Sequence, residues 1–400
     1  MNIQSKSIVL MILVLSAAAL AATPALALGG AETDARAGDA TDGGTPEPAG
    51  AGFSRVQSFV ESLEPGRAAT CGRLTVVPLH RTGGSPSADG LLTLEEALEK
   101  RMVVIREKDG GTVPRLILTN RSQRPVYIMG GEILSGGKQD RIVARDVIVG
   151  PRKSGVSLPV YCVEHGRWTG RTEKFYSKQN LGTHELRSNA QAGKSRSQEK
   201  IWRKIDETNR SLGVESDTSA YQDAYDHGEI RDSIEEAERR LLSLPEASTR
   251  VVGVVVCVDG EIVSIDLFAS SALFRRLWPK ILRAAMTDAL TVPSMGAGAE
   301  AVGTAKIESL VEAHLAALGR QGYTVRAAVD QGKELSHEDD ALTTGALVFE
   351  GEIIHLASFP APAEEDQSQD RIGRVQGINR QHRSNRPQRS GQEQTSLLPR

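Results

Sequence analysis

The distribution of large apolar side chains limits the part of this 400-residue chain that can fold into a packed core. From Gly29 to Gly52 the sequence consists mainly of Gly, Ala, Asp, Thr and Pro, and from Ala361 to Arg400 only scattered Ile, Val and Leu occur. Such segments cannot bury enough apolar surface to offset the entropy that ordering costs. We therefore expect a folded body over residues 53–360, a disordered linker over 28–52 and a disordered, arginine-containing tail over 361–400.

The N-terminus has the order of a secretory signal peptide. Lys6 precedes an apolar run from Ile8 to Ala22, and small residues follow around Ala25-Leu26-Ala27. The run is shorter than the ~20 apolar residues of a bilayer span. We predict that residues 1–27 are a signal peptide cleaved near Ala27, so that the product is periplasmic or extracellular and meets the membrane only transiently. A membrane-anchored product is the alternative.

Charge and cysteine content exclude several classes of protein. Lysine and arginine total 48 against 51 aspartate and glutamate residues, so no net positive field indicates specific nucleic-acid binding. The cysteines, Cys71, Cys162 and Cys257, are too few for a disulfide scaffold and leave at least one thiol unpaired. The tail, which lacks acidic residues from Arg374 to Arg389, is predicted to be solvated and disordered, with contact to anionic surfaces as the alternative.

Short β-type segments dominate residues 72–168. They are Leu74–Leu79, Met102–Ile105, Leu116–Leu118, Pro125–Met129, Ile142–Val149 and Val156–Val163. Asp109-Gly110-Gly111 predicts a hairpin between the second and third of them. Thr93 and Glu96 have the spacing of a capping box and predict a short helix after the first. Short strands at near-regular spacing are typical of a sandwich or barrel-like unit.

Helical patterns and further hairpins follow over residues 196–360. Apolar stripes at helical spacing lie within 234–241, 274–285 and 307–318, and Pro279 predicts a break in the second. Two similar hairpins, Val255–Ile265 and Ala346–Leu356, are either neighbours in one antiparallel sheet or alike by chance. The sequence thus predicts an α+β fold, with a β-rich, sandwich- or barrel-like N-terminal half followed by helices and antiparallel hairpins.

The densest polar cluster is the glycine-rich segment from Gly130 to Arg141. Glycines let a backbone turn tightly and approach a ligand, and Lys138 and Arg141 are suited to hold phosphate or carboxylate. The segment is not a P-loop, because Gln139 stands where Ser or Thr is required. The same residues also fit two turns flanked by solvated charges, so both interpretations stay open.

A second cluster runs from Pro159 to Trp168. Glu164 and His165 lie near a strand end, where a carboxylate and an imidazole can provide acid–base chemistry. Glu132 from the glycine-rich segment is a candidate second carboxylate. Cys162 is interpreted as a small buried hydrophobe.

Other chemistry-bearing residues give weaker signals. His314 lies on an apolar helical stripe and His355 lies at the end of an apolar segment, so both are interpreted as core histidines. No HExxH, CxxC or paired-histidine spacing occurs, and the sequence therefore predicts neither a metal nor a cofactor.

Together the two clusters resemble a known family. The pattern Gly131-Glu132-x-Leu134-x-Gly136-x-Lys138-Gln139-x-Arg141, followed by Pro159-Val160-x-Cys162-Val163-Glu164-x-Gly166-Arg167-Trp168, is similar to the ARG and rhodanese-phosphatase-superfamily-associated protein domain family. ARG stands for ADP-ribosylglycohydrolase, and the resemblance extends from about residue 74 to 359. It implies an ADP-ribose-like or other phosphorylated ligand, and it marks Glu132, Lys138, Gln139, Arg141, Glu164, Arg167 and Trp168 as family-pattern residues.

Three functions are compatible with these residues. The first is a small-molecule-binding module that holds a phosphorylated or nucleotide-like ligand. Its ligand-binding residues are Lys138, Gln139, Arg141, Arg167 and Trp168, the last stacking on a base or sugar.

The other two functions use the same segments differently. A hydrolase or glycosyl-transfer enzyme takes Glu132 and Glu164 as a carboxylate pair with His165 assisting. In a non-catalytic envelope scaffold, an ion pair such as Glu164–Arg167 or Glu132–Arg141 only stabilises the fold. The binding module is favoured, and whether the protein is an enzyme stays open.

Overall fold

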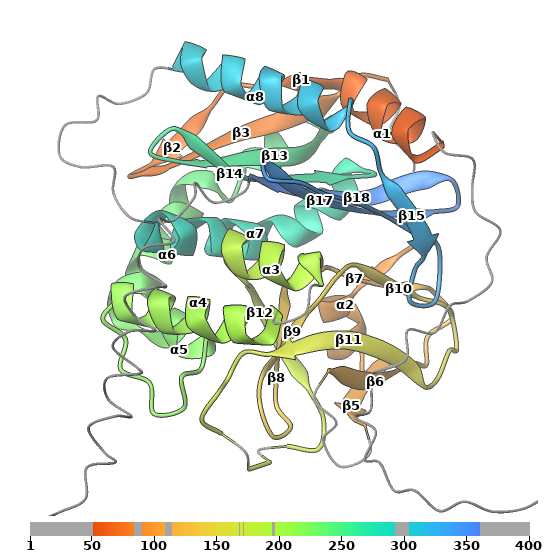
Figure 1. Cartoon of the computed structure of the whole chain (residues 1–400), viewed down its shortest axis with the longest axis vertical. Coiled ribbons are helices and arrows are strands. Elements are labelled where there is room, and N and C mark those ends of the chain that lie inside the picture. The colour runs from red at the N-terminus through yellow and green to blue at the C-terminus, as the bar shows by residue number, and fades with distance from the viewer. Residues whose placement is uncertain are drawn as a thin grey trace, which may run out of the picture. The chain divides into compact units, whose positions relative to one another are not determined.

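The computed structural model describes residues 51–83, 90–108, 114–167, 169–170, 172–193, 197–292 and 304–360. The predicted signal peptide, the predicted tail and nearly all of the predicted linker lie outside these residues, so those assignments stay predictions. The described chain combines three sheets with helices in the order shown in Figure 1. The α+β prediction, with strand-rich N-terminal half, central helices and C-terminal hairpins, is confirmed.

The largest sheet has nine strands. They are β1 (Leu63–Pro65), β2 (Ala69–Cys71), β3 (Leu74–Arg81), β13 (Val251–Val258), β14 (Glu261–Phe268), β15 (Thr324–Ala327), β16 (Lys333–Glu338), β17 (Leu342–Phe349) and β18 (Glu352–Pro360). Their order is β1-β3-β13-β14-β18-β17-β16-β15, and β2 pairs with β3. The two similar hairpins are therefore neighbours, because β14 pairs with β18 in antiparallel register.

Two smaller sheets form the N-terminal half. One contains β4 (Leu92–Thr93), β7 (Val126–Ile128) and β10 (Val147–Val149), and the other contains β5 (Val103–Glu107), β6 (Arg115–Asn120), β8 (Glu132–Ser135), β9 (Arg141–Val143), β11 (Val156–Cys162) and β12 (Tyr176–Leu181). Their apolar faces share one core with α2 (Leu94–Glu99), which begins at the predicted capping box of Thr93 and Glu96. The expectation that strand 74–81 belongs to this half is wrong, since β3 pairs with β13 of the largest sheet.

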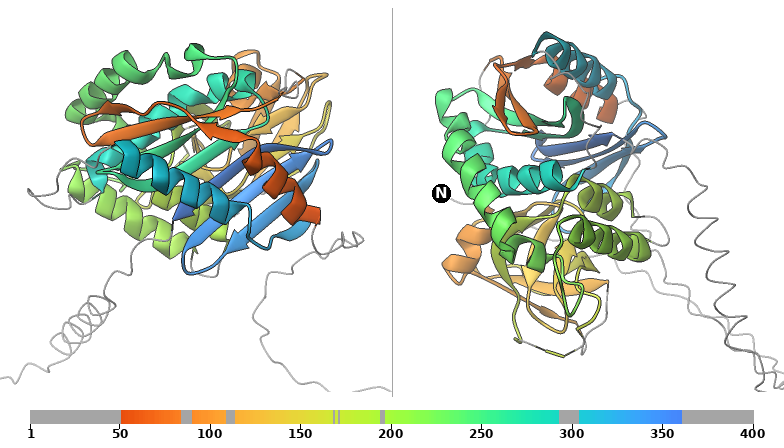
Figure 2. Two further views of the ribbon diagram at one scale, coloured as in Figure 1. Left: turned by 90° about the horizontal axis from the view of Figure 1, so that it is seen from above. Right: turned by 90° about the vertical axis from the view of Figure 1, so that its left-hand side faces the viewer.

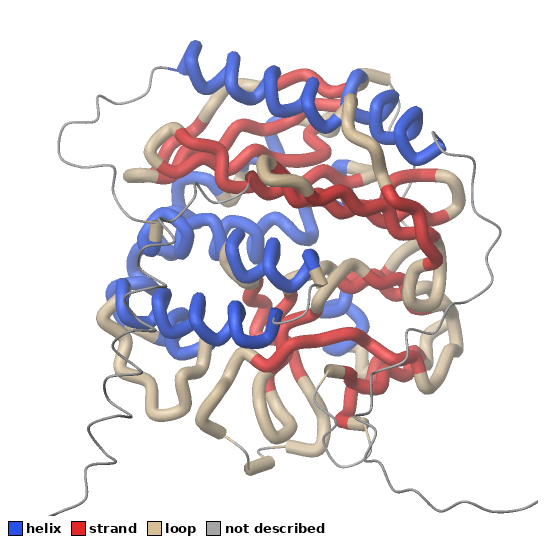
Figure 3. The backbone as a smooth tube through the Cα atoms, in the orientation of Figure 1, coloured by secondary structure: helices blue, strands red, loops and turns tan. Residues whose placement is uncertain are grey.

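Helices cover both faces of the nine-stranded sheet. Besides α2, the described helices are α1 (Ala51–Glu61), α3 (His184–Ala192), α4 (Ser197–Ser211), α5 (Gln222–Asp226), α6 (Gly228–Leu241), the short 3-10 helix Leu244–Ala247, α7 (Ser271–Thr291) and α8 (Thr304–Leu318). Figure 2 shows α1 and α8 side by side on the outer face, where Val56 and Val311 join one core with Val77. Figure 3 shows the remaining long helices between the upper and lower groups of strands.

Helix α7 joins the two halves and runs unbroken through Pro279, so the predicted break is wrong. Proline removes one backbone hydrogen bond and usually kinks a helix. Here most side chains around it are buried, including Phe274, Leu277, Trp278 and Ile281, and their packing outweighs that loss. The helix contacts β13 on one side and β12 on the other.

The turn before β16 also joins the halves. The Gly150 N–H donates to the Asp330 carboxylate at 2.9 Å, and the Gln331 N–H donates to the Ile148 carbonyl at 3.2 Å. These bonds fix the start of β16 against β10. They place Glu334 of β16 within 3.2 Å of Arg145, which precedes β10.

Candidate functional site

The two predicted polar clusters meet in one buried network at the end of β11. The guanidinium of Arg167 donates to both Glu164 oxygens, at 2.7 and 2.5 Å, and to Asp140 at 3.1 Å. Glu164 also accepts from the Asp140 N–H at 3.1 Å and from the Thr218 hydroxyl at 3.0 Å. Burial opposes ionisation of Glu164, but these bonds, chiefly those from Arg167, hold its pKa below the usual value.

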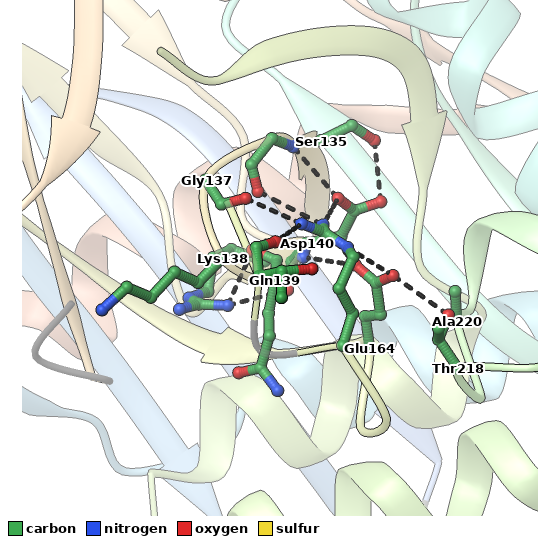
Figure 4. A network of polar contacts seen from close by, with 12 residues as sticks. Ser135, Gly137, Lys138, Gln139, Asp140, Glu164, Thr218 and Ala220 are labelled. Atoms are coloured by element: carbon green, nitrogen blue, oxygen red, sulfur yellow. Dashed lines mark hydrogen bonds and ion pairs between the residues drawn. The ribbon is translucent and has the colours of Figure 1, made fainter. Parts of the chain in front are cut away.

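The cations of the glycine-rich segment are differently placed. Arg141 is buried at 1% exposure, donates to the Gln139 carbonyl at 2.7 Å and lies 3.9 Å from Glu107. Gln139 is buried as well and donates weakly to the His165 carbonyl at 3.4 Å. Figure 4 shows the half-buried Lys138 side chain pointing away from the network. Lys138 is therefore the member of this segment best placed to meet an external anion.

The glycines of this segment face the protein's own atoms. A Cβ on Gly131, whose φ is +94°, would lie 2.5 Å from the Arg187 side chain. One on Gly137, whose φ is +53°, would lie 2.5 Å from the Phe175 ring and 2.8 Å from Glu107. The chain thus needs glycine here for a left-handed backbone and close internal packing.

Replacing Arg167 with Met is expected to lower the free energy of unfolding by about 2–3 kcal/mol. The change leaves the buried Glu164 and Asp140 carboxylates without their cation. Urea titration measures the loss, and Lys138→Met is the control, with an expected loss below about 1 kcal/mol. Equal losses in the two variants would contradict this account of the loop.

Glu132 lies in a different network. Its Oε1 accepts from the Lys280 ammonium at 2.8 Å, and Lys280 also bonds to Glu95 at 2.5 Å. Of the Glu132 oxygens, Oε2 has no partner among the described residues. Burial, together with the charge of Glu95, raises the pKa of Glu132 to about 7 against the opposing effect of Lys280. The cation that pairs with Glu132 is thus Lys280 of α7.

The structure does not bring Glu132 and Glu164 together. Two strand spacings of ~4.8 Å across β8, β9 and β11, and about four residues of ~3.3 Å each along them, separate the two Cα atoms by roughly 16 Å. His165 is exposed and packs its ring on Trp202, with 4.3 Å between centroids. Trp168 lies outside the described residues, so its predicted stacking role is not addressed.

A third polar network crosses the interface between the two halves. The guanidinium of Arg187 on α3 pairs with Asp266 on β14, and one Asp266 oxygen lies 3.0 Å from His355 Nε2. His355 Nδ1 lies 2.7 Å from the Asp146 carboxylate, whose other oxygen accepts from the Gly130 N–H at 2.7 Å. We call these four side chains the Arg187–Asp146 chain.

The buried members of this chain are charged because each is paired with a neighbour of opposite charge. Burial opposes protonation of His355, but the Asp146 and Asp266 carboxylates raise its pKa to about 9. Burial likewise opposes ionisation of Asp266, and the Arg187 guanidinium and His355 hold its pKa well below the usual value. At neutral pH His355 is therefore a cation between two carboxylates.

Only the Asp146 end of the chain approaches the surface. The Asp146 side chain is 13% exposed, whereas those of Asp266 and His355 are at most 1% exposed. Nearby, the Tyr127 hydroxyl is buried and has no hydrogen-bond partner among the described residues. Burial and the charges of Asp146 and Glu132 raise its pKa well above the usual value.

Two polar cavities beside the C-terminal end of α3 share the Gln191 side chain, and we call the smaller one the inner part and the larger one the outer part. The inner part, with a volume of about 10 Å³, is lined by Asp146, Gln191, Glu334 and the β17 segment from Gly345. The outer part, of about 290 Å³, also has Gln191 in its wall, together with residues of β15, β16 and β17. We call the two parts together the Gln191 cleft.

The Gln191 amide is the group that the two parts share. Its Nε2 is buried and has no partner in the described part of the chain. It lies over Gly345, where an added Cβ would come within 2.6–2.9 Å of the amide atoms. Glycine at this position therefore makes room for the Gln191 amide.

The sequence interpretation missed Asp146, Arg187, Asp266 and Gln191, and it took His355 for a core histidine. His355 is indeed buried, but between charges. A usable signal was present, because Asp266 interrupts the apolar strand β14 and Lys280 interrupts the apolar face of α7. Charged residues are almost never fully buried unless they are paired. By contrast His314, near Ser358 at 3.3 Å, behaves as a core histidine, and burial lowers its pKa to about 4.

Some features concern the described residues as a whole. They contain no group of three or more His, Cys, Asp or Glu side chains that could hold a metal ion. Within the same ranges, no helix has the length and apolar character to cross a bilayer. Cys71, Cys162 and Cys257 are buried free thiols.

Comparison with known proteins places the chain in a family. Neither the curated proteins nor the solved structures include one that matches it. A family model does match over residues 62–359, which span all three sheets and the three polar networks. The chain belongs to the ARG and Rhodanese-Phosphatase-superfamily-associated Protein domain family.

Proposed function

We propose that this domain binds a small, hydroxyl-rich, phosphorylated molecule in the Gln191 cleft. The observation that supports the proposal best is the Arg187–Asp146 chain, whose Asp146 end lines the inner part of that cleft. Removing four charged groups from water costs several kcal/mol per ion unless the pairing is very good. Perturbed charges that lead into a cleft are typical of functional sites.

The cleft wall matches a sugar phosphate in chemistry. Residues with hydroxyl groups, Thr324, Ser336 and Thr343, line its outer part. Hydroxyls and the Gln191 amide both donate and accept, as the hydroxyls of a sugar require. Asp146 adds a fixed acceptor in the inner part, and Arg326 of the outer wall, with 48% of its side chain exposed beside Glu334, is suited to a phosphate.

Size narrows the ligand further. Pockets for drug-sized ligands commonly measure ~300–1,000 Å³, and the outer part of this cleft is at the lower limit of that range. A pentose phosphate fits such a volume better than a whole dinucleotide. The ADP-ribose-like ligand expected from the sequence would then place its ribose phosphate end in the cleft.

The glycine-rich segment from residue 130 to 141 is the second candidate site for a phosphorylated ligand. What favours it is the outward direction of Lys138. Arg141 and Arg167, expected to share this role, are at most 7% exposed and bond to carbonyl and carboxylate oxygens of the protein, whereas the Arg326 side chain in the cleft is 48% exposed. We therefore rank this site below the Gln191 cleft.

A glycine substitution tests the proposal without removing a charge. In Gly345→Ala the new Cβ displaces the Gln191 amide, which is the end of a flexible side chain, so the variant is expected to fold. Ribose 5-phosphate at about 100 times its dissociation constant should stabilise the wild type by ~2.7 kcal/mol, a shift of several degrees in melting temperature. In Gly345→Ala, the apparent affinity for ribose 5-phosphate, taken from the melting-temperature shift against ligand concentration, is expected to be at least tenfold lower.

The matched control is Gly228→Ala, because a Cβ at Gly228 meets no atom within 4 Å. It should keep the full ligand response. Lys138→Ala, run in parallel, reports on the second site. No response to ribose 5-phosphate in the wild type, or an unchanged response in Gly345→Ala, would reject the cleft as the binding site.

A further inference from the structure

We propose that the Gln191 cleft is hydrolytic and cleaves the bond between the anomeric carbon of a sugar and a phosphate leaving group, with Asp146 as the general base. This inference rests on the proposed function and names its reaction and substrate class.

Asp146 is held as an acceptor that faces the cleft. One oxygen accepts the Gly130 N–H at 2.7 Å and the other faces His355 Nδ1 at the same distance. These bonds fix the carboxylate, which still has lone pairs for a third donor. His355 is a positioning residue, since it is buried and reaches the cleft only through Asp146.

The inner cleft has room for about one water molecule. A water needs a volume of ~10–15 Å³ and two to four polar partners, and the inner part offers about 10 Å³. Asp146 and Glu334 supply carboxylate oxygens there, and Gln191 Nε2 is a buried donor with no partner among the described residues. A water in this position contacts the Asp146 base and the Gln191 amide, which also lines the outer part.

Hydrolysis then proceeds by attack of this water on the sugar. The water oxygen forms a bond to the anomeric carbon while its proton passes to the Asp146 carboxylate. The bond between that carbon and the phosphate oxygen breaks, and the electron pair leaves with the phosphate. Asp146 returns the proton to solvent through its exposed edge, so the products are the free sugar and inorganic phosphate.

Glu334 explains why the leaving group should be a phosphate. Its Oε2 accepts from Arg145 at 3.2 Å and from Arg326 at 3.1 Å, and its Oε1 accepts from Arg326 at 2.7 Å. Both oxygens thus face guanidinium donors, and neither is placed to protonate a leaving group. A phosphate departs as an anion without a proton, and Arg326, which also lines the outer part, is placed to stabilise its charge.

The test uses α-D-ribose 1-phosphate as substrate and ribose 5-phosphate as a ligand without a leaving group at the anomeric carbon. Phosphate release above the enzyme-free rate is expected from the first compound only. In water enriched in oxygen-18 the label should enter the ribose and not the phosphate. Label in the phosphate would mean attack at phosphorus and would overturn the proposed bond cleavage.

Variants separate the base from binding. Asp146→Asn is expected to lower the rate of phosphate release at least 100-fold, the usual contribution of general base catalysis. Gln191→Ala, which removes no charge, should lower it about tenfold and serves if Asp146→Asn does not fold. Asp226→Asn on α5 is the matched control, because Asp226 also pairs with a cation, Lys178 at 3.0 Å, but does not line the cleft, and it should keep the wild-type rate.

The outcomes distinguish this inference from the proposed function. Thermal stabilisation by both ribose phosphates without phosphate release keeps the binding proposal and overturns hydrolysis. Release that Asp146→Asn and Gln191→Ala leave unchanged also overturns it. If the protein shows no thermal stabilisation and no phosphate release, both proposals are overturned.

Discussion

Replacing Arg187 with Met is expected to lower the free energy of unfolding by about 3–5 kcal/mol. Arg187 is buried at 5% exposure and is the cation paired with the fully buried Asp266. Removing one partner of a buried ion pair leaves the other charge uncompensated, which costs more than the pair itself contributes. Methionine keeps much of the volume of the side chain, so lost packing is a minor part of the expected effect.

Urea titration of wild type and variant at neutral pH measures this difference. The control is Arg283→Met on α7, whose bond to Glu238 joins two partly exposed side chains, and whose expected cost is below about 1 kcal/mol. A loss below 1 kcal/mol in Arg187→Met would mean that Asp266 does not depend on this cation.

The second large effect is a loss of stability at alkaline pH. The pKa of His355 is raised to about 9 in the fold from an unfolded value near 6.5. A raised histidine pKa contributes stability that is fully present below about pH 6.5 and is lost as the pH rises through 9. The shift corresponds to ~3 kcal/mol lost between these limits.

Melting curves between pH 6.5 and 9.5 test this expectation. His184, whose pKa is also raised against burial by Asp288, contributes in the same direction, so the comparison with His355→Gln isolates the effect. The variant is less stable at pH 6.5 and should show a clearly smaller decline above it. Parallel curves for the two proteins would contradict a protonated His355.

Local signals allowed much of the fold to be predicted. The capping box of Thr93 and Glu96, and the turns at Asp259-Gly260 and Glu350-Gly351, depend on neighbouring residues alone. The pairing of β3 with β13 joins segments far apart in sequence and has no local signal. The continuity of α7 through Pro279 depends on tertiary packing, which outweighs the local preference for a break.

The site was predictable only in part, for the same reason. Glu164, Arg167 and Arg141 do converge, because neighbouring strands and a short loop bring them together. Their hydrogen-bond partners are other groups of the protein. The residue types alone could not predict this, because the same side chains are equally suited to bind a ligand. The Arg187–Asp146 chain takes members from α3, β14, β18 and the loop before β10, so no window of sequence contains it.

A crystal structure of the protein with ribose 5-phosphate would show whether a sugar phosphate binds in the Gln191 cleft. We expect the ligand in the cleft, with its hydroxyls within about 3 Å of the Gln191 amide and the Asp146 carboxylate. Binding in the cleft would be contradicted if ribose 5-phosphate lay at Lys138 in the glycine-rich segment and none lay in the Gln191 cleft.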